Sequence, residues 1–164
     1  AVIEVLRSKG LKISGADTRN GFSSVIWPGR FEVINKEPLI LVDSAHNQDS
    51  ALRLRLAMDD YLNGKPVILL FGASEDKDVR GMFTHLLPRV RLVVATKSTH
   101  PRAMEPDILV ELANQFGKKA LLTQSVEEGL KIAIEQAGRE TAIMIAGSVF
   151  VAAAAREIIL TKSS

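Results

Sequence analysis

The chain has 164 residues, of which 46% are hydrophobic and 24% are charged. That balance is typical of one globular domain with a sizeable core, and it excludes a disordered tail, a collagen-like chain and a small disulfide-stapled scaffold. The sequence has no Cys, which excludes disulfides, thiolate metal sites and cysteine nucleophiles and is compatible with the reducing cytoplasm, where we expect the protein. We expect no nucleic-acid partner, because the formal net charge is only +2, and no membrane partner, because no apolar run reaches the ~18 residues of a membrane span.

The N-terminal residues have the pattern of a helix that begins without a cap. The chain starts at Ala1 rather than Met, and apolar side chains follow at once between residues 2 and 6. No capping residue stands before them, although helices usually begin with one. We therefore expect residues 1–164 to be one domain of a longer protein, with residues 1–26 serving as a lead-in helix and linker from a preceding domain.

Beyond this segment, short apolar runs alternate with amphipathic segments. A β-hairpin is expected first, because residues 31–34 and 38–43 both have strand character and only three residues separate them. The later runs are short, rich in Val, Ile and Leu, and end in polar or Gly residues, which is typical of strands buried on both faces of a parallel sheet. We expect these later strands at 66–72, 91–96, 119–123 and 141–147.

The segments between the expected strands have the apolar spacing of amphipathic helices. Pro106 is suited to the first turn of a helix, and the residues after it place apolar side chains at i, i+3 and i+4 spacing. Ser125 followed by Glu128 predicts a capping box, and Gly138 predicts a helix end. The expected helices cover 50–62, 79–87, 106–116, 125–138 and 147–160.

This order of elements predicts an α/β fold. Repeated strand–helix units connect parallel strands by right-handed crossovers and place helices on both faces of the sheet. We expect a three-layer α/β/α sandwich, Rossmann-like, with a mostly parallel sheet of about six strands and one antiparallel strand at the N-terminal hairpin. Such sheets bind ligands at the carboxyl ends of their strands, so the residues that follow each strand are the candidate site.

The segment after the second strand offers nucleotide-binding chemistry. Asp43 could accept hydrogen bonds from ribose hydroxyls, and His46 could donate to phosphate oxygens beside the positive end of the following helix. The alternative is structural, with Asn47 or Asp49 capping the helix and Asp43 simply ending the strand. Position in the sequence alone does not separate these interpretations.

The later strand ends carry cationic and hydroxyl side chains. Lys77 could hold a carboxylate or phosphate, or it could belong to an exposed charged loop in which Asp78 caps the next helix. His100 and Arg102 could grip an anion, since a guanidinium binds carboxylates bidentately, or they could form a polar turn. Ser148 begins the last helix, where a hydroxyl usually serves as a cap but would here also lie on the ligand face.

Trp27-Pro28-Gly29-Arg30 precedes the hairpin and predicts a rigid turn that projects Arg30. We interpret Trp27 as a packing residue rather than as a stacking partner for a ligand. Arg30 could reach a nucleotide or be a surface charge. The sequence contains no G-x-x-x-x-G-K-[ST] phosphate loop, no G-x-G-x-x-G dinucleotide motif and no G-x-S-x-G nucleophile elbow.

Read in order, these segments resemble one family. Trp27-Pro28-Gly29-Arg30 followed by Phe31-Glu32, and then LVDSAHN at residues 41–47, are similar to the C-terminal domain of folylpolyglutamate synthases, which belong to the Mur ligase superfamily. The G-A-S-E-D-K-D, H-P-R-A and G-S segments are less specific but fall where this family has them. The resemblance spans nearly the whole chain.

The resemblance implies ATP-dependent amide ligation, in which L-glutamate is added to a folate or its glutamate tail through an acyl phosphate. The binding residues that it implies are Arg30, Asp43, His46 and Asn47 for the nucleotide, and Lys77, Arg102 and Ser148 for the incoming amino acid. Asp43 would hold the ribose, and His46 would be the catalytic residue that supports the charged transition state.

The same resemblance implies ATP and Mg²⁺ as cofactors, with folate and L-glutamate as substrates of a monomer. In this family the phosphate loop and the magnesium ligands lie in an N-terminal ATPase domain, which would be the partner of this chain. We therefore expect no metal ligand here and no activity from this chain alone.

Ser44 departs from the family pattern, which usually has Gly at this position. A Ser fits there only if the backbone is not in a glycine-only conformation. Two alternatives to the folate enzyme remain: another Mur-type ligase, of the peptidoglycan or cyanophycin type with its D-Y-A-H segment, and a noncatalytic nucleotide-binding module whose strand-end residues only cap helices. The Trp-Pro-Gly-Arg-x-Glu context and the His-Asn pair favour the folate enzyme.

Overall fold

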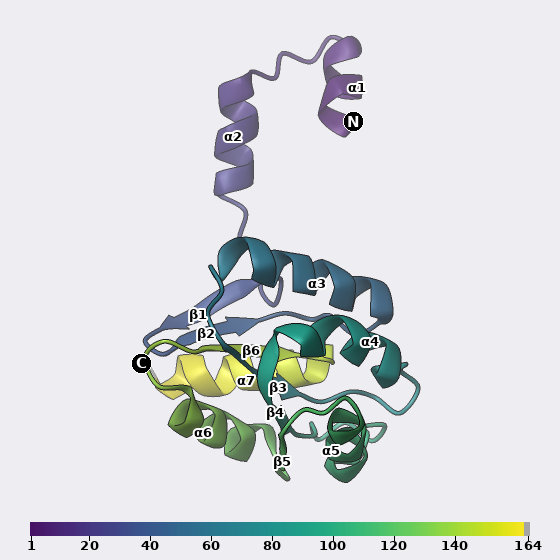
Figure 1. Ribbon diagram of the computed structural model, residues 1–164. Coiled ribbons are helices and arrows are strands. Elements are labelled where there is room, and N and C mark those ends of the chain that lie inside the picture. Colours follow the sequence, from purple (N-terminus) through teal and green to yellow (C-terminus); the bar gives the residue numbers. More distant parts are fainter. Residues whose placement is uncertain (163–164) are drawn as a thin grey trace.

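The computed structural model describes residues 1–162, which form one mixed sheet with helices on both faces (Figure 1). The strands are β1 (Glu32–Lys36), β2 (Leu39–Val42), β3 (Val67–Phe71), β4 (Val90–Ala95), β5 (Ala120–Leu122) and β6 (Ala142–Ala146). The helices are α1 (Val2–Ser8), α2 (Gly15–Ser23), α3 (Gln48–Tyr61), α4 (Val79–Leu86), α5 (Pro106–Gln115), α6 (Val126–Ala137) and α7 (Val149–Lys162). The sheet order is β1-β2-β6-β3-β4-β5, and within it β1 pairs antiparallel with β2 while the remaining pairs are parallel. The expected three-layer α/β/α fold, with its single antiparallel strand at the N-terminal hairpin, is confirmed.

Two apolar layers hold the sheet between its helices. On one face, α3, α4 and α5 pack through residues such as Leu54 and Met82. On the other face, α6 and α7 pack through residues such as Leu130. Every residue of β3 is buried, and neighbours along the strand enter opposite layers, as Leu70 and Phe71 do. Burial on both faces is the reason why these strands are continuous apolar runs rather than alternating ones.

The capping box expected at α6 is only half right. The Ser125 hydroxyl accepts the Glu128 N–H, and Gly138 ends the helix with a φ of 62°. The Glu128 carboxylate, however, accepts the Gln124 N–H at 2.7 Å, one residue before the expected partner. Helix α6 still begins where the sequence predicts, because the hydroxyl satisfies one of the unpaired N–H groups of its first turn.

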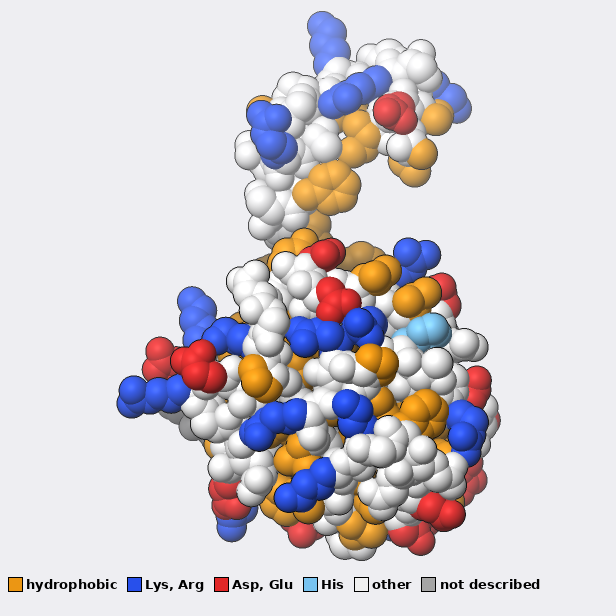
Figure 2. Space-filling view, viewed as in Figure 1, with side chains coloured by type: hydrophobic (Ala, Val, Ile, Leu, Met, Phe, Trp, Pro, Cys, Tyr) orange, Lys and Arg blue, Asp and Glu red, His pale blue; other side chains and the backbone are white. Residues whose placement is uncertain are grey.

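The N-terminal segment contains a second helix, α2, where only a linker was expected. The Ser14 hydroxyl accepts the Asp17 N–H, and the Asp17 carboxylate accepts the Ser14 N–H, which is a capping box built with Asp. The two helices α1 and α2 extend away from the body of the molecule (Figure 1). Hydrophobic side chains are exposed on them, including Val5 and Phe22, which are 53% and 70% exposed (Figure 2).

Gly147 joins β6 to α7 in a conformation that leaves no room for a side chain. Its φ is +106°, and an added Cβ would lie 2.5 Å from the Gly72 carbonyl oxygen. We expect Gly147→Ala to lower the free energy of unfolding by about 2–5 kcal/mol, the sum of left-handed strain and overpacking. Urea denaturation measures this loss. Gly138→Ala is the matched control, because Gly138 also has a positive φ (+62°) but no atom within 4 Å of the added Cβ. Equal losses in the two variants would contradict the steric account.

Candidate functional site

A pocket of about 480 Å³ opens at the carboxyl edge of the sheet. The segments after β2, β3, β4 and β6 contribute to it, together with the turn before β1. Five of the predicted site residues line it: Arg30, His46, Lys77, Arg102 and Ser148. Three of them are Lys or Arg, so the pocket suits an anionic ligand. Asp43 and Asn47 do not line it.

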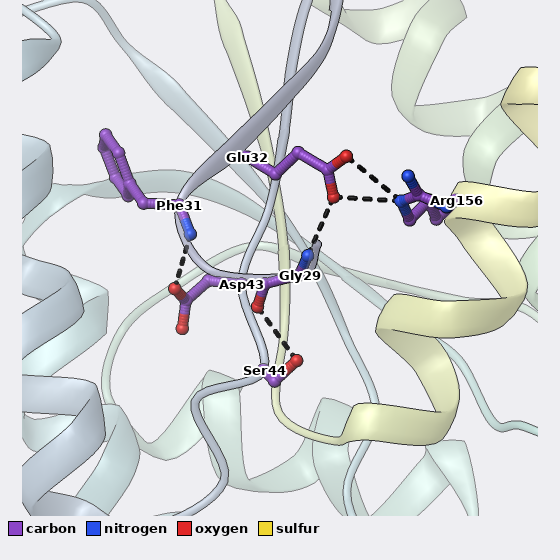
Figure 3. Close-up of polar contacts among 6 residues, drawn as sticks. All are labelled: Gly29, Phe31, Glu32, Asp43, Ser44 and Arg156. Atoms are coloured by element: carbon purple, nitrogen blue, oxygen red, sulfur yellow. Dashed lines mark hydrogen bonds and ion pairs between the residues drawn. The ribbon is translucent and has the colours of Figure 1, made fainter. Parts of the chain in front are cut away.

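Asp43 is held by backbone amides on both sides. Its Oδ2 accepts the Phe31 N–H and its Oδ1 accepts the Ala45 N–H, each at 2.8 Å (Figure 3 shows the first of these bonds). Burial raises the pKa of Asp43 above its ordinary value, while these N–H groups and the charge of Arg30 act in the opposite direction. The carboxylate therefore fixes the turns around it, and a ligand can use only its remaining lone pairs.

Asn47 is the N-cap of α3, as the structural alternative predicts. Its Oδ1 accepts the Ser50 N–H at 2.8 Å, and the Ser50 hydroxyl accepts the Asn47 N–H at 3.0 Å. Its amide nitrogen is the group that remains for a ligand contact. Asp78 caps α4 in the same way, by accepting the Gly81 N–H at 2.8 Å.

His46 lines the pocket, and a backbone carbonyl group orients its ring. The ring Nδ1 lies 2.9 Å from the Ser44 carbonyl oxygen. Because a carbonyl oxygen only accepts, Nδ1 must carry a proton, which leaves Nε2 for a ligand. Nε2 can donate to a phosphate oxygen only when the ring holds both protons.

Lys77 and Arg102 both lie close to the carboxylate of Asp76, which was not among the predicted site residues. The Lys77 Nζ lies 2.8 Å from Asp76 Oδ2, and an Arg102 guanidinium nitrogen lies 3.9 Å from Asp76 Oδ1. The hydrogen bond from Lys77 is the main cause that lowers the pKa of Asp76 below its ordinary value. The sequence feature that could have pointed to Asp76 is its position directly before Lys77. A substrate carboxylate that binds both cations must share them with Asp76 or displace it.

Ser148 combines a structural contact with a place in the pocket. Its side chain is buried, and its hydroxyl accepts the Phe150 N–H at 3.2 Å at the start of α7. The Phe150 ring stacks on His100, with centroids 4.1 Å apart and planes at 20°. His100 does not line the pocket, and its Nδ1 accepts the Arg102 N–H at 3.2 Å. His100 therefore shapes the turn that carries Arg102 rather than gripping an anion.

The interpretation of Trp27 as a packing residue is wrong. Its side chain is 68% exposed and lines the pocket. Arg30, on the same turn, is also exposed, whereas Gly29 between them is buried. The turn therefore presents Trp27, Pro28 and Arg30 to the pocket and buries Gly29.

Ser44 fits its backbone without strain. Among the residues that the structure describes, the non-Gly residues with positive φ are Phe31 and Asn63. Ser44 is thus outside the glycine-only region, so the departure from the family pattern has no steric cost. Its hydroxyl donates to the Gly29 carbonyl oxygen at 2.9 Å (Figure 3).

The model of one protein family, the Mur ligase, glutamate ligase domain, matches residues 29–149. The chain belongs to this family. The match includes all five of the predicted residues that line the pocket, from Arg30 to Ser148. The pocket is thus a feature of a Mur ligase domain, at the edge of the sheet where the sequence predicts ligand binding.

Relatives of this Mur ligase domain are longer proteins. It is 33% identical over 137 residues to the "Probable bifunctional folylpolyglutamate synthase/dihydropteroate synthase" of Haloferax volcanii, covering 83% of this chain and 16% of that protein. It is 29% identical over 163 residues to the dihydrofolate synthase/folylpolyglutamate synthase of Escherichia coli, covering 99% of this chain and 37% of the relative.

Two solved structures have the same fold as this chain over most of its length. The structure described as E. coli FolC in complex with DHPP and ADP matches with a TM-score of 0.88 at 27% identity, over 99% of this chain and 38% of that one. A Mycobacterium tuberculosis folylpolyglutamate synthase complexed with ADP matches with a TM-score of 0.84, over 92% of this chain and 36% of that one. The chain therefore spans well under half the length of the relatives it matches.

Two kinds of site are absent from residues 1–162. No group of three or more His, Cys, Asp or Glu side chains gathers there in a way that could hold a metal ion. No helix in the same range is long and apolar enough to cross a membrane. The acidic residues beside the pocket segments have protein partners instead, Asp76 with Lys77 and Asp78 with a backbone amide.

Proposed function

We propose that this chain is the C-terminal domain of an ATP-dependent ligase that adds L-glutamate to a folate or to its glutamate tail, acting as a monomer. The observation that carries the proposal is the cationic pocket of a Mur ligase domain, which gathers Arg30, His46, Lys77 and Arg102 at the carboxyl edge of the sheet. The likeness to folylpolyglutamate synthases along nearly the whole chain supports the substrate class.

The proposed chemistry forms one amide bond. The folate carboxylate attacks the γ-phosphoryl group of ATP, which releases ADP and forms an acyl phosphate. The amine of glutamate then attacks the acyl carbon, displaces phosphate and loses a proton. Both steps collect negative charge on phosphate oxygens, and preorganised cationic donors stabilise such charge most effectively. The pocket fits this requirement, because Lys and Arg side chains dominate the predicted residues that line it.

The nucleotide is proposed to bind at one side of the pocket and to reach beyond its lining to Asp43 and Asn47. Arg30 pairs with phosphate oxygens as a guanidinium fork. Asp43 accepts a ribose hydroxyl with a lone pair that Phe31 and Ala45 leave free, and Asn47 adds its amide N–H groups. His46, as the proposed catalytic residue, turns Nε2 toward the transferred phosphoryl group, since the Ser44 carbonyl engages Nδ1.

The other side is proposed to hold the amino acid, through Lys77, Arg102 and Ser148. We expect Lys77→Ala and Arg102→Ala each to raise the KM for glutamate about 10- to 100-fold, the equivalent of losing one hydrogen bond to a charged group. The KM for ATP should change much less. Steady-state rates at varied glutamate concentrations measure the effect.

Lys97→Ala is the matched control for these two variants. Lys97 also follows a strand end, but its Nζ pairs with Glu105 at 2.7 Å and it does not line the pocket. Its replacement should leave the KM for glutamate unchanged. Equal effects of Lys77→Ala and Lys97→Ala would contradict the assignment of Lys77 to the amino-acid site.

A preceding ATPase domain is proposed to complete the site. It would supply the phosphate loop, whose backbone amides cradle ATP, and the carboxylates or hydroxyls that bind Mg²⁺. Residues 1–26, with α1 and α2, would connect that domain to this one. The exposed hydrophobic side chains of these helices, such as Phe22 and Ile26, support contact with such a neighbour.

A second candidate is a ligase of peptidoglycan precursors. This chain is 31% identical over 140 residues to the UDP-N-acetylmuramoyl-L-alanyl-D-glutamate--L-lysine ligase of Streptococcus thermophilus. Phosphate release by the complete enzyme, measured with ATP and either folate plus L-glutamate or the muramoyl dipeptide plus L-lysine, separates the two candidates. We expect release with the folate pair only. Release with the muramoyl pair only would overturn the proposed substrate class.

A further inference from the structure

The turn of residues 27–30, which presents Arg30 to the pocket, is fixed by contacts at its buried centre, Gly29. The Gly29 N–H donates to Glu32 Oε2 at 2.7 Å (Figure 3). The Gly29 carbonyl oxygen accepts the Ser44 N–H at 2.8 Å and the Ser44 hydroxyl at 2.9 Å. Both backbone polar groups of Gly29 are therefore satisfied by residues outside the turn itself.

Glu32, which accepts the Gly29 N–H, is itself held by Arg156 of α7. Both Glu32 carboxylate oxygens lie within hydrogen-bond distance of Arg156 Nε, at 3.1 and 3.0 Å (Figure 3). Burial raises the pKa of Glu32, but the hydrogen bonds from Arg156 and from the Gly29 N–H outweigh it, so the pKa lies below its ordinary value. Because α7 also begins at the pocket, this ion pair connects the turn to the helix that directly follows Ser148.

The backbone adopts left-handed conformations at Gly29, where glycine does so readily, and at Phe31 directly after the turn, where it is strained. Gly29 has a φ of +69°, and Phe31 has a φ of +45°, which is uncommon for a bulky residue. Such strain persists only where surrounding contacts over-determine the conformation, and it gathers at functional sites. Here the contacts are the Asp43 carboxylate on the Phe31 N–H, together with the bonds at Gly29.

We propose that Ser44, Glu32 and Arg156 are positioning residues that lock the 27–30 turn so that Arg30 meets the nucleotide. The inference rests on the proposed function, in which Arg30 contacts ATP. The side-chain hydrogen bonds of Ser44 and Glu32 go to the Gly29 backbone and to Arg156, and none goes to Arg30, although Ser44 also lines the pocket. We expect their effect to pass through the turn and to alter ATP binding more than the chemical step.

The test measures the KM for ATP and the kcat of the complete enzyme for Ser44→Ala, Glu32→Gln and Arg30→Ala, and for each of the first two combined with Arg30→Ala. We expect Ser44→Ala and Glu32→Gln to raise the KM for ATP about 3- to 10-fold with kcat nearly unchanged, as for the loss of one hydrogen bond. Combined with Arg30→Ala they should add nothing, because residues that act through one another are not additive.

Two further variants keep the test decisive. Ser44→Gly removes the same hydroxyl at a position where Gly is the usual residue of this family, so it should reproduce Ser44→Ala if folding is a concern. Glu157→Gln is the matched control, because Glu157 is an exposed carboxylate on α7 next to Arg156. It should leave both constants unchanged.

The outcomes separate this inference from the function on which it rests. If Arg30→Ala raises the KM for ATP while Ser44→Ala, Ser44→Gly and Glu32→Gln do not, the positioning role is overturned and the nucleotide site stands. Full additivity with Arg30→Ala also overturns it. If Arg30→Ala itself leaves the KM for ATP unchanged, the nucleotide assignment fails and this inference fails with it.

Discussion

Asp43→Asn is expected to lower kcat/KM for ATP about 10- to 100-fold in the complete enzyme, as for the loss of a hydrogen bond to a charged group. The proposed ribose contact is one reason. The other is that Asn replaces one carboxylate oxygen by an NH₂ group, which cannot accept either of the N–H groups that Asp43 now serves, those of Phe31 and Ala45. Steady-state rates at varied ATP concentrations measure the loss.

The structure predicts that Asp43→Asn also lowers stability, so a second variant is needed. His46→Ala removes a side chain whose ring makes one contact to a carbonyl oxygen, and we expect it to lower kcat about 100-fold with little change in stability. Asp49→Asn is the control, since Asp49 is exposed in the first turn of α3. Full turnover by both Asp43→Asn and His46→Ala would show that the proposed site is wrong.

This chain by itself is expected to show no ATP-dependent ligation. Its sequence lacks the phosphate loop, and the backbone amides of such a loop normally cradle the phosphates of ATP. Phosphate release in the presence of ATP, folate and L-glutamate measures the activity of the chain, with the complete enzyme as the positive control. Ligation above background by this chain alone would show that the preceding domain is not required.

The fold could be predicted because its strands are buried on both faces. The run that became β3 is apolar at every position, and no exposed face interrupts it. The hairpin could be predicted from the strand character of two segments and the short spacing between them. Helix α2 could not, because its capping box uses Asp17 instead of Glu or Gln and none of its residues is buried, so no apolar stripe marks it.

The pocket could be predicted from a rule of topology, whereas the contacts within it could not. The segments that follow the strands were expected to form the site at one sheet edge, and those after β2, β3, β4 and β6 line the pocket. The 27–30 turn lines it too, but it precedes a strand and the rule does not cover it. One hydrogen-bond donor to Asp43 is the N–H of Phe31, twelve residues earlier in the chain, so this contact depends on the tertiary fold rather than on neighbouring residues. The exposure of Trp27 and the sharing of Asp76 by two cations likewise depend on loop shape, which local sequence patterns do not encode.

The most direct test of the central claim is a crystal structure of the complete enzyme with an ATP analogue and L-glutamate bound. We expect the ribose and phosphates against Arg30, Asp43 and His46, and a glutamate carboxylate against Lys77 and Arg102. Nucleotide and amino acid bound together elsewhere on this domain, with this pocket holding neither, would contradict the account.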